Sequence, residues 1–162
     1  MITLALDTAT HSCGYAVFDG VSPIYWGVLK EKDKLLGKRL LGLYGSILQL
    51  VKKYGIDHIV FEDTNELRNV QTLKKLCYLH GIVMTICFQE NISYSSMLPS
   101  EWRKRLSFKT GSSVGQTRDV QKQLALDYVQ MIMGYDVDCD DTAEALCLGV
   151  VFTSQYIGVG ND

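Results

Sequence analysis

Three apolar segments of strand length open the sequence, and their order limits the possible folds more than any other feature. They span residues 1–6, 14–18 and 24–29. Asp19-Gly20, between the second and third segments, is a typical hairpin turn pair. Because a hairpin joins neighbouring strands, we expect the three strands to form an antiparallel meander.

A helix pattern and a fourth strand pattern follow the meander. Apolar residues recur at helical spacing over residues 34–53, with Asp33 as the expected cap and Gly55 as the expected end of the helix. The apolar segment 56–61 then predicts a strand. A strand, a helix and a second strand imply a right-handed crossover, so two strands of the sheet must be parallel.

The rest of the chain alternates between helix and strand patterns and then becomes helical. The predicted elements are a helix over 68–88, a strand over 91–97, a short helix from Pro99, a polar loop over 107–115, and helices over 116–133 and 139–155. No internal repeat or linker divides them. We therefore expect one α/β domain over residues 1–162, in which helices flank a five-stranded mixed sheet with three antiparallel first strands.

The composition is that of a globular protein and names no partner by itself. Of the 162 residues, 47% are hydrophobic and 21% are charged, and the formal net charge is −2, which excludes a uniformly basic coat for nucleic acid and a disordered acidic chain. The five cysteines form no CxxC pair, so free thiols in a reducing cytoplasm are expected. We expect no signal peptide, since Asp7 interrupts the first apolar segment, and no membrane span, because the apolar runs are too short.

Carboxylates occupy the ends of two predicted strands and one face of the last predicted helix. Asp7 ends the first strand pattern and Glu62 ends the fourth. Asp141 and Glu144 are three residues apart and share a face of a largely apolar helix, which should meet the sheet. Each acid alone has an ordinary structural explanation, such as a helix cap at Asp140 or Asp141. Together they predict a cluster of converging carboxylates.

Such a cluster has a chemical consequence. Converging carboxylates cannot all ionise without a cation, and oxygen ligands favour Mg²⁺, with Mn²⁺ as a substitute. Two such ions about 4 Å apart make a site for phosphodiester hydrolysis. The sequence contains no HExxH, no GxSxG and no phosphate-binding GxxxxGK[ST] or GxGxxG, so a zinc site, a serine nucleophile and a nucleotide cofactor are not indicated.

A basic segment precedes the acidic helix. Between residues 101 and 122 the positively charged residues are Arg103, Lys104, Arg105, Lys109, Arg118 and Lys122. Glu101 and Asp119 are the acids of this segment, and Trp102 and Phe108 lie among the basic residues. Local positive charge of this kind is what DNA binding needs. The alternative is a solvated helix face with Trp102 in the core.

The helix pattern over 68–88 carries apolar residues on most of its circumference. Such a helix either lies in the centre of the core or packs one side on a second subunit. His80, in the same helix, is expected to be a core or interface residue rather than a catalyst.

The acidic segments resemble the motifs of the RuvC Holliday junction resolvases. Residues 7–17 (DTATHSCGYAV) are similar to the first motif of that family, in which a strand aspartate and a short turn precede Gly-Tyr-small-Val. Residues 59–62 are similar to its second acidic strand, and residues 141–146 to its closing helix with two carboxylates. The resemblance extends from residue 2 to about 152 and is closest to the short RuvC-like endonucleases of lactococcal phages.

The resemblance implies an RNase H-like fold and a homodimer that nicks four-way junctions and other branched DNA with Mg²⁺, an activity of DNA recombination and repair. It assigns catalysis and metal binding to four carboxylates, which are Asp7, Glu62, Asp141 and Glu144, with Asp140 as a competing ligand. It implies that the basic residues of 101–122 contact DNA phosphates. The cytoplasm would be the place of action, that of the host if a phage encodes the chain.

The chain also departs from the bacterial pattern. Thr8-Ala9 replaces Pro-Gly, Glu144 replaces an aspartate, and no aromatic residue closely follows Glu62, which implies a looser sequence preference at the cut. Two alternatives remain open. Residues 4–10 also resemble the TsaB-type scaffold proteins of tRNA threonylcarbamoyladenosine formation, and a resolvase fold could bind branched DNA without cutting it. The later acids favour the nuclease over both.

Overall fold

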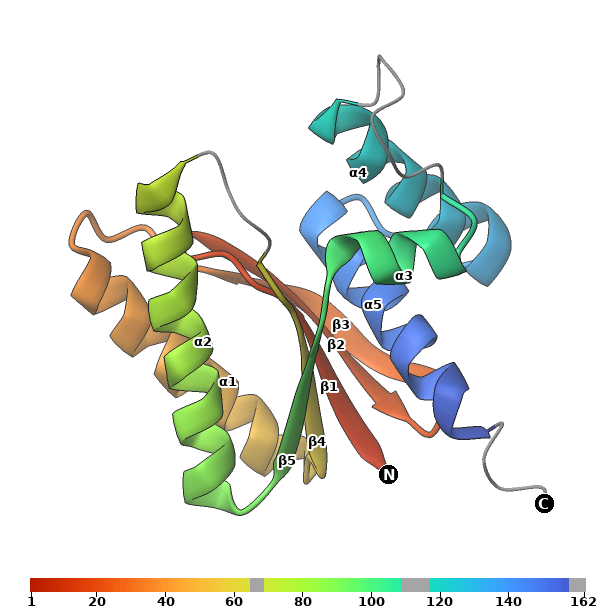
Figure 1. Ribbon diagram of the computed structural model, residues 1–162. Helices are drawn as coiled ribbons and strands as arrows, with labels where there is room; N and C mark the ends of the chain where they lie inside the picture. The colour runs from red at the N-terminus through yellow and green to blue at the C-terminus, as the bar shows by residue number, and fades with distance from the viewer. Residues whose placement is uncertain (65–68, 109–116, 158–162) are drawn as a thin grey trace.

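The computed structural model describes residues 1–64, 69–108 and 117–157 (Figure 1). Five strands form one sheet: β1 (Ile2–Asp7), β2 (Ser12–Asp19), β3 (Ser22–Lys30), β4 (His58–Glu62) and β5 (Ser93–Met97). Their order across the sheet is β3-β2-β1-β4-β5. Strand β2 is antiparallel to β1 and β3, whereas β4 is parallel to β1 and β5. The expected mixed sheet with an antiparallel meander is confirmed.

Helices cover both faces of this sheet. They are α1 (Leu36–Tyr54), α2 (Val70–Glu90), α3 (Pro99–Arg105), α4 (Arg118–Asp127), the π-helical η1 (Tyr128–Met133) and α5 (Asp140–Ile157). Figure 1 shows α1 and α2 on one face and α3, α4 and α5 on the other. Two groups of buried apolar side chains match these layers, one including Leu43 and Leu79 and the other including Trp102 and Leu146. No helix of the described ranges is long and apolar enough to cross a membrane.

Strand β1 lies between the two cores. Leu4 and Leu6 belong to the core under α1 and α2, whereas Ala5 belongs to the core under α5. All three side chains are fully buried, as the two-residue repeat of a strand covered on both faces requires. Apart from Thr3, the strand is therefore apolar until Asp7, at its carboxyl end.

Glycines let helix α5 lie directly against the sheet. A Cβ at Gly14 of β2 would lie 1.9 Å from the backbone oxygen of Asp141, and one at Gly149 would lie 2.1 Å from the ring of Phe18. Neither distance leaves room for a larger residue at these two positions. The close approach brings the first turn of α5 to the ends of β1 and β2.

Helix α1 begins later than the sequence predicts. Its first residue is Leu36, and no side chain caps its first turn. The Asp33 carboxylate instead accepts a hydrogen bond of 2.8 Å from the backbone N–H of Leu35, so it closes a turn that precedes the helix. The helix ends at Gly55 as predicted, in the left-handed conformation with φ of 61°.

Two of the three other long helix predictions are also adjusted. Asn69 caps α2, because its side chain accepts hydrogen bonds from the backbone N–H groups of Gln71 and Thr72, and the helix continues to Glu90. The helix expected over 116–133 is divided into α4 and η1 at Tyr128. The predicted loop over 107–115 lies mostly outside the described residues.

Candidate active site

The parallel pairing of β1 and β4 brings two acidic strand ends together. Leu6 of β1 pairs with Phe61 of β4, so the residues that follow, Asp7 and Glu62, lie side by side at the same edge of the sheet. The side chain of Asp7 is buried and that of Glu62 is half-buried. Two neighbouring carboxylates removed from water are costly unless a positive charge compensates them.

Helix α5 adds two more carboxylates to this edge. One oxygen each of Asp7, Asp141 and Glu144 can be chosen such that all three lie within 4.8 Å of one another. A cavity of about 350 Å³ is lined by these three acids together with Glu62. The structure thus brings the four carboxylates singled out from the sequence into one pocket.

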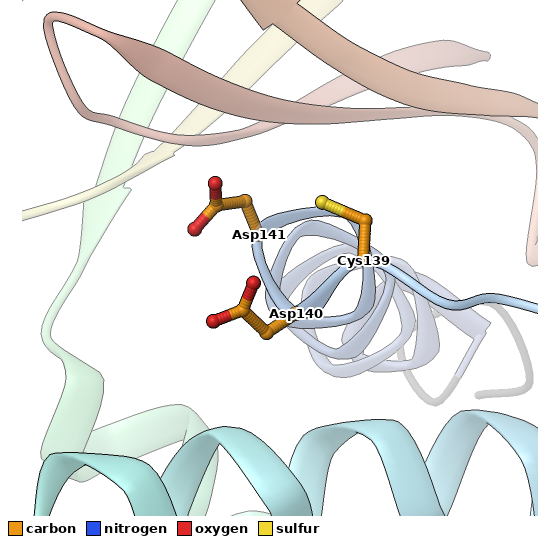
Figure 2. A group of neighbouring side chains, drawn as sticks. All are labelled: Cys139, Asp140 and Asp141. Atoms are coloured by element: carbon orange, nitrogen blue, oxygen red, sulfur yellow. The ribbon is translucent and has the colours of Figure 1, made fainter.

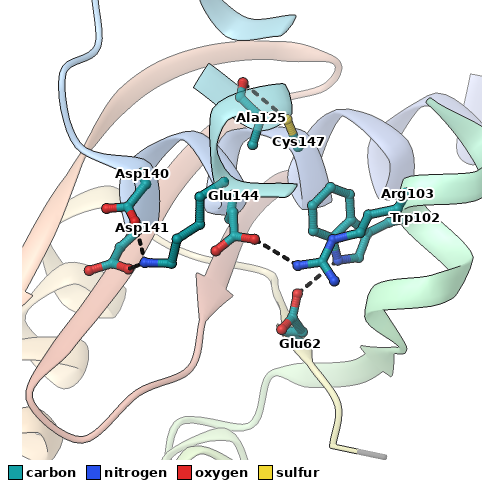
Figure 3. A network of polar contacts seen from close by, with 9 residues as sticks. Glu62, Trp102, Arg103, Ala125, Asp140, Asp141, Glu144 and Cys147 are labelled. Carbon is teal, nitrogen blue, oxygen red and sulfur yellow. Dashed lines mark hydrogen bonds and ion pairs between the residues drawn. The ribbon is translucent and has the colours of Figure 1, made fainter. Parts of the chain in front are cut away.

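Helix α3 places a cation and an indole against the acidic pocket (Figure 3). Arg103 Nη2 donates a hydrogen bond of 2.7 Å to Glu144 Oε1, and Trp102 Nε1 donates one of 2.9 Å to Glu62 Oε2. The guanidinium group also lies over the Trp102 ring, 4.7 Å from its centroid. Arg103 and Trp102 therefore fix the orientation of two of the four acids.

A second cation, from helix α4, contacts the beginning of α5. Lys122 Nζ forms an ion pair with Asp140 and lies 3.6 Å from Asp141 Oδ1. From the opposite side, the Ser12 hydroxyl donates a hydrogen bond to Asp141 Oδ2. Asp141 is therefore held between β2 and α4.

Asp141 lines the pocket, whereas Asp140, the residue before it, does not. Figure 2 shows the two carboxylates near each other at the start of α5, with the Cys139 thiol close by. These three residues offer ligand atoms within 4.8 Å of one another, and so do Asp141, Asp7 and Glu144. Within the part of the chain that the structure describes, Asp141 is common to both groups, whereas Asp140 belongs only to the group that contains Cys139.

Burial and mutual repulsion change the acidity of the two strand-end acids. The pKa of Asp7 is raised well above its ordinary value, first by burial and then by the charges of Glu62, Glu144 and Asp141. The pKa of Glu62 is raised to about 7 by burial and by Glu144, against the opposing effect of Arg103. The pocket therefore concentrates more negative charge than the neighbouring Arg and Lys side chains neutralise.

The ligand atoms of the acidic pocket fit a hard divalent cation. Its four acids offer oxygen atoms alone, which Mg²⁺ and Mn²⁺ prefer over the thiolate and imidazole ligands typical of zinc. A bound divalent cation would also remove the repulsion that raises the pKa values of Asp7 and Glu62.

The six basic residues expected to bind DNA lie in different environments. Arg103 and Lys122 form ion pairs with carboxylates at the pocket, and Arg118 lines the pocket. Lys104 and Arg105 are exposed on α3. Lys109 lies outside the described residues. The structure thus brings Arg103 and Lys122 to the acids rather than to an open surface.

Sequence reasoning did not find the polar roles of three residues around the acids. The indole N–H of the fully buried Trp102 binds Glu62, and the hydroxyl of Ser12 binds Asp141. The Thr8 hydroxyl donates to the backbone oxygen of Glu62 at 3.0 Å and lies 3.0 Å from Nε2 of His80, which is buried. A hydroxyl directly after a strand-end acid was the available signal for Thr8.

The family model and the curated relatives that match this chain name the same family. The family model of the crossover junction endodeoxyribonuclease RuvC matches residues 3–152. RuvC of Brachyspira hyodysenteriae is 24% identical over 160 residues, which cover 96% of this chain and 95% of that protein. RuvC of Fusobacterium nucleatum is 26% identical, with 91% of this chain and 77% of that protein covered.

Solved structures agree on the fold. Thermus thermophilus RuvC in complex with a Holliday junction substrate superposes with a TM-score of 0.77 at 15% identity, covering 98% of this chain and 96% of the other. The fowlpox virus resolvase in complex with Holliday junction DNA has a TM-score of 0.64 at 17% identity, with coverages of 97% and 99%. These matches support the RNase H-like resolvase fold and give no support to a TsaB-like scaffold. Since the family model spans nearly the whole sequence, the chain belongs to the RuvC family of crossover junction endodeoxyribonucleases.

Proposed function

We propose that this chain is an endodeoxyribonuclease that nicks four-way junctions, and other branched DNA, with the help of Mg²⁺. The observation that carries the proposal is the pocket in which Asp7, Glu62, Asp141 and Glu144 converge. The RuvC relatives, and the related resolvases solved with Holliday junction DNA, support the choice of substrate. We assign the activity to one nuclease domain formed by residues 1–162.

The same four acids are the proposed ligands of Mg²⁺, with Mn²⁺ as a substitute. Asp140 faces Lys122 and is the competing ligand. When bound, the ions supply activation of the attacking water and neutralisation of charge on the scissile phosphate. In the hydrolysis, the water oxygen forms a bond to phosphorus while the bond between phosphorus and one sugar oxygen breaks.

The protein's own contribution is to hold the acids before the ions arrive. Arg103 and Trp102 keep the carboxylates of Glu144 and Glu62 directed into the pocket through hydrogen bonds of 2.7 and 2.9 Å. The Thr8 hydroxyl anchors the backbone of Glu62 on the neighbouring strand. A site that is already formed loses little free energy to reorganisation when substrate binds.

We assign the DNA contacts to the basic residues that surround this pocket. Arg118 lines the pocket, and Lys104 and Arg105 are exposed on the adjoining helix. Arg103, Lys122 and Lys109 complete the proposed set. Because Arg103 and Lys122 already contact carboxylates, their contribution to DNA binding should be smaller than that of the exposed residues.

The proposal includes a homodimer. Two active sites related by a two-fold axis suit the opposed strands of a four-way junction. On α2, the side chains of Tyr78 and Phe88 are 55% and 79% exposed, which supports an association surface on this helix.

Incubation with end-labelled DNA tests the substrate. We expect nicks in a four-way junction in the presence of Mg²⁺, and far fewer in a linear duplex of the same sequence. A replication fork and a flap, tested alongside, rank the branched substrates. Tight junction binding without nicks in Mg²⁺ or Mn²⁺ would replace the proposal with a non-cutting DNA-binding protein, and equal cutting of the linear duplex would contradict selectivity for branched DNA.

A further inference from the structure

The acidic pocket continues into a second cavity. This cavity has a volume of about 380 Å³ and shares walls with the first, among them Thr72 of α2, Arg118 of α4 and Asp141 of α5. Its remaining walls include His11, in the turn between β1 and β2, and Lys75, one turn along α2 from Thr72. The two cavities are therefore adjacent, and Asp141, in the first turn of α5, lines both; together they are called the groove below.

The charge changes sign along this groove. Four carboxylates line the first cavity against two guanidinium groups. The second cavity has one carboxylate, Asp141, against the three cations Lys75, Arg118 and Lys122. One end of the groove therefore attracts cations and the other attracts anions.

Two of the three cations at the basic end form no ion pair with a carboxylate in the part of the chain that the structure describes. Lys122 is paired with Asp140 and lies near Asp141. Neither Lys75 nor Arg118 has a carboxylate oxygen within 4.0 Å among residues 1–64, 69–108 and 117–157. Arg118 also lines the acidic cavity and lowers the pKa of Glu62, so the acids partly compensate its charge. Lys75, at the wall of the second cavity, has no such carboxylate among the described residues and favours occupancy by an anion.

We propose that the second cavity binds the DNA backbone phosphate next to the scissile phosphate in the same strand, with Lys75 as a positioning residue. The inference rests on the proposed function. A strand whose scissile phosphate lies over the four acids carries further phosphates at fixed spacing on both sides, and the shared walls at Thr72 and Arg118 place the basic cavity beside that position. A flanking phosphate held there fixes the register of the strand over the acids.

The chain supplies a matched control for the test. Lys74 and Lys75 are adjacent and exposed on α2, but only Lys75 lines the cavity. Lys74→Ala and Lys75→Ala therefore change the net charge equally and differ in the proposed contact. Lys75→Arg keeps the charge and should bind the junction as wild type does.

The measurement is junction affinity in EDTA, by fluorescence anisotropy across a salt series, followed by single-turnover cleavage in Mg²⁺. For Lys75→Ala we expect about a fivefold to tenfold weaker affinity and a salt dependence reduced by about one released counterion. We also expect less uniform cut positions, whereas Lys74→Ala and Lys75→Arg should behave as wild type. Competition by inorganic phosphate tests whether the cavity takes a free anion: weakening of wild type but not of Lys75→Ala supports a phosphate site.

Each outcome separates this inference from the function on which it rests. Equal losses of junction affinity for Lys74→Ala and Lys75→Ala, with unchanged cut positions, would show that Lys75 contributes only its charge to the overall electrostatic field. That result would overturn the phosphate subsite and leave the junction cleavage itself unaffected. A wild-type protein that neither binds nor cuts the junction would overturn the proposed function itself.

Discussion

Replacing Arg103 by Met should destabilise the metal-free protein, and a divalent cation should reverse most of that loss. Arg103 Nη2 lies 2.7 Å from Glu144 Oε1, and the two side chains are only 15% and 8% exposed. Breaking a buried ion pair by removing one partner costs about 3–5 kcal/mol, and the residual exposure of Arg103 favours the lower end, about 3 kcal/mol. For a domain of this length, that loss corresponds to a decrease in Tm of about 6–12 °C.

The assay is urea unfolding of wild type and variant in EDTA and again in Mg²⁺. A cation bound by the four acids takes over the compensation of Glu144, so the difference between the two proteins should fall from about 3 kcal/mol to below about 1 kcal/mol. Arg105→Met, at an exposed position of the same helix, is the control and should cost less than about 0.5 kcal/mol in both solutions. An equal difference for Arg103→Met with and without Mg²⁺ would refute the reasoning that cations and Arg103 compensate the same carboxylates.

Substitutions at Glu62, Gly14 and Arg105 also have defined expected outcomes. In metal-free protein, Glu62 stabilises the fold fully below its ordinary pKa of 4.5, and this contribution is lost as the pH rises through about 7, so Glu62→Gln should flatten the fall in Tm across that range. Gly14→Ala should destabilise by about 3 kcal/mol in thermal unfolding, because its Cβ would meet the backbone of Asp141, whereas Gly45→Ala on α1 meets nothing within 4 Å and should not destabilise. Arg105→Glu should weaken junction binding and flatten its salt dependence in gel-shift assays, and unchanged binding would remove this residue from the DNA surface.

The parts of the fold that local sequence determines could be predicted. Each strand and helix pattern depends on residues close in the chain, and the order of elements leaves few topologies once the crossover is right-handed. The same logic found the acids, because Asp7 and Glu62 end neighbouring parallel strands and Asp141 and Glu144 share one helix face.

The partners of those acids depend on contacts between residues distant in the sequence. Trp102 is 40 residues from Glu62, and Arg103 is 41 from Glu144, so no periodicity relates them. Their positions follow from the packing of α3 on α5, which buries Trp102 and leaves the next residue at the pocket. A run of basic residues predicts positive charge but not which of its members turns inward. The start of α1 was also missed, since Asp33 serves either as a helix cap or as a turn residue.

Junction cleavage with and without metal shows whether Asp7 and its neighbouring acids make this chain a metal-dependent nuclease. Cleavage of a labelled four-way junction is followed for wild type and Asp7→Asn, each with Mg²⁺ or with EDTA, after junction binding in EDTA has shown that both proteins are folded and bind equally. We expect wild type to nick the junction in Mg²⁺ but not in EDTA, and Asp7→Asn to nick it at least about a hundredfold more slowly in Mg²⁺. Nicking by wild type in EDTA, or undiminished nicking by Asp7→Asn, would contradict this expectation.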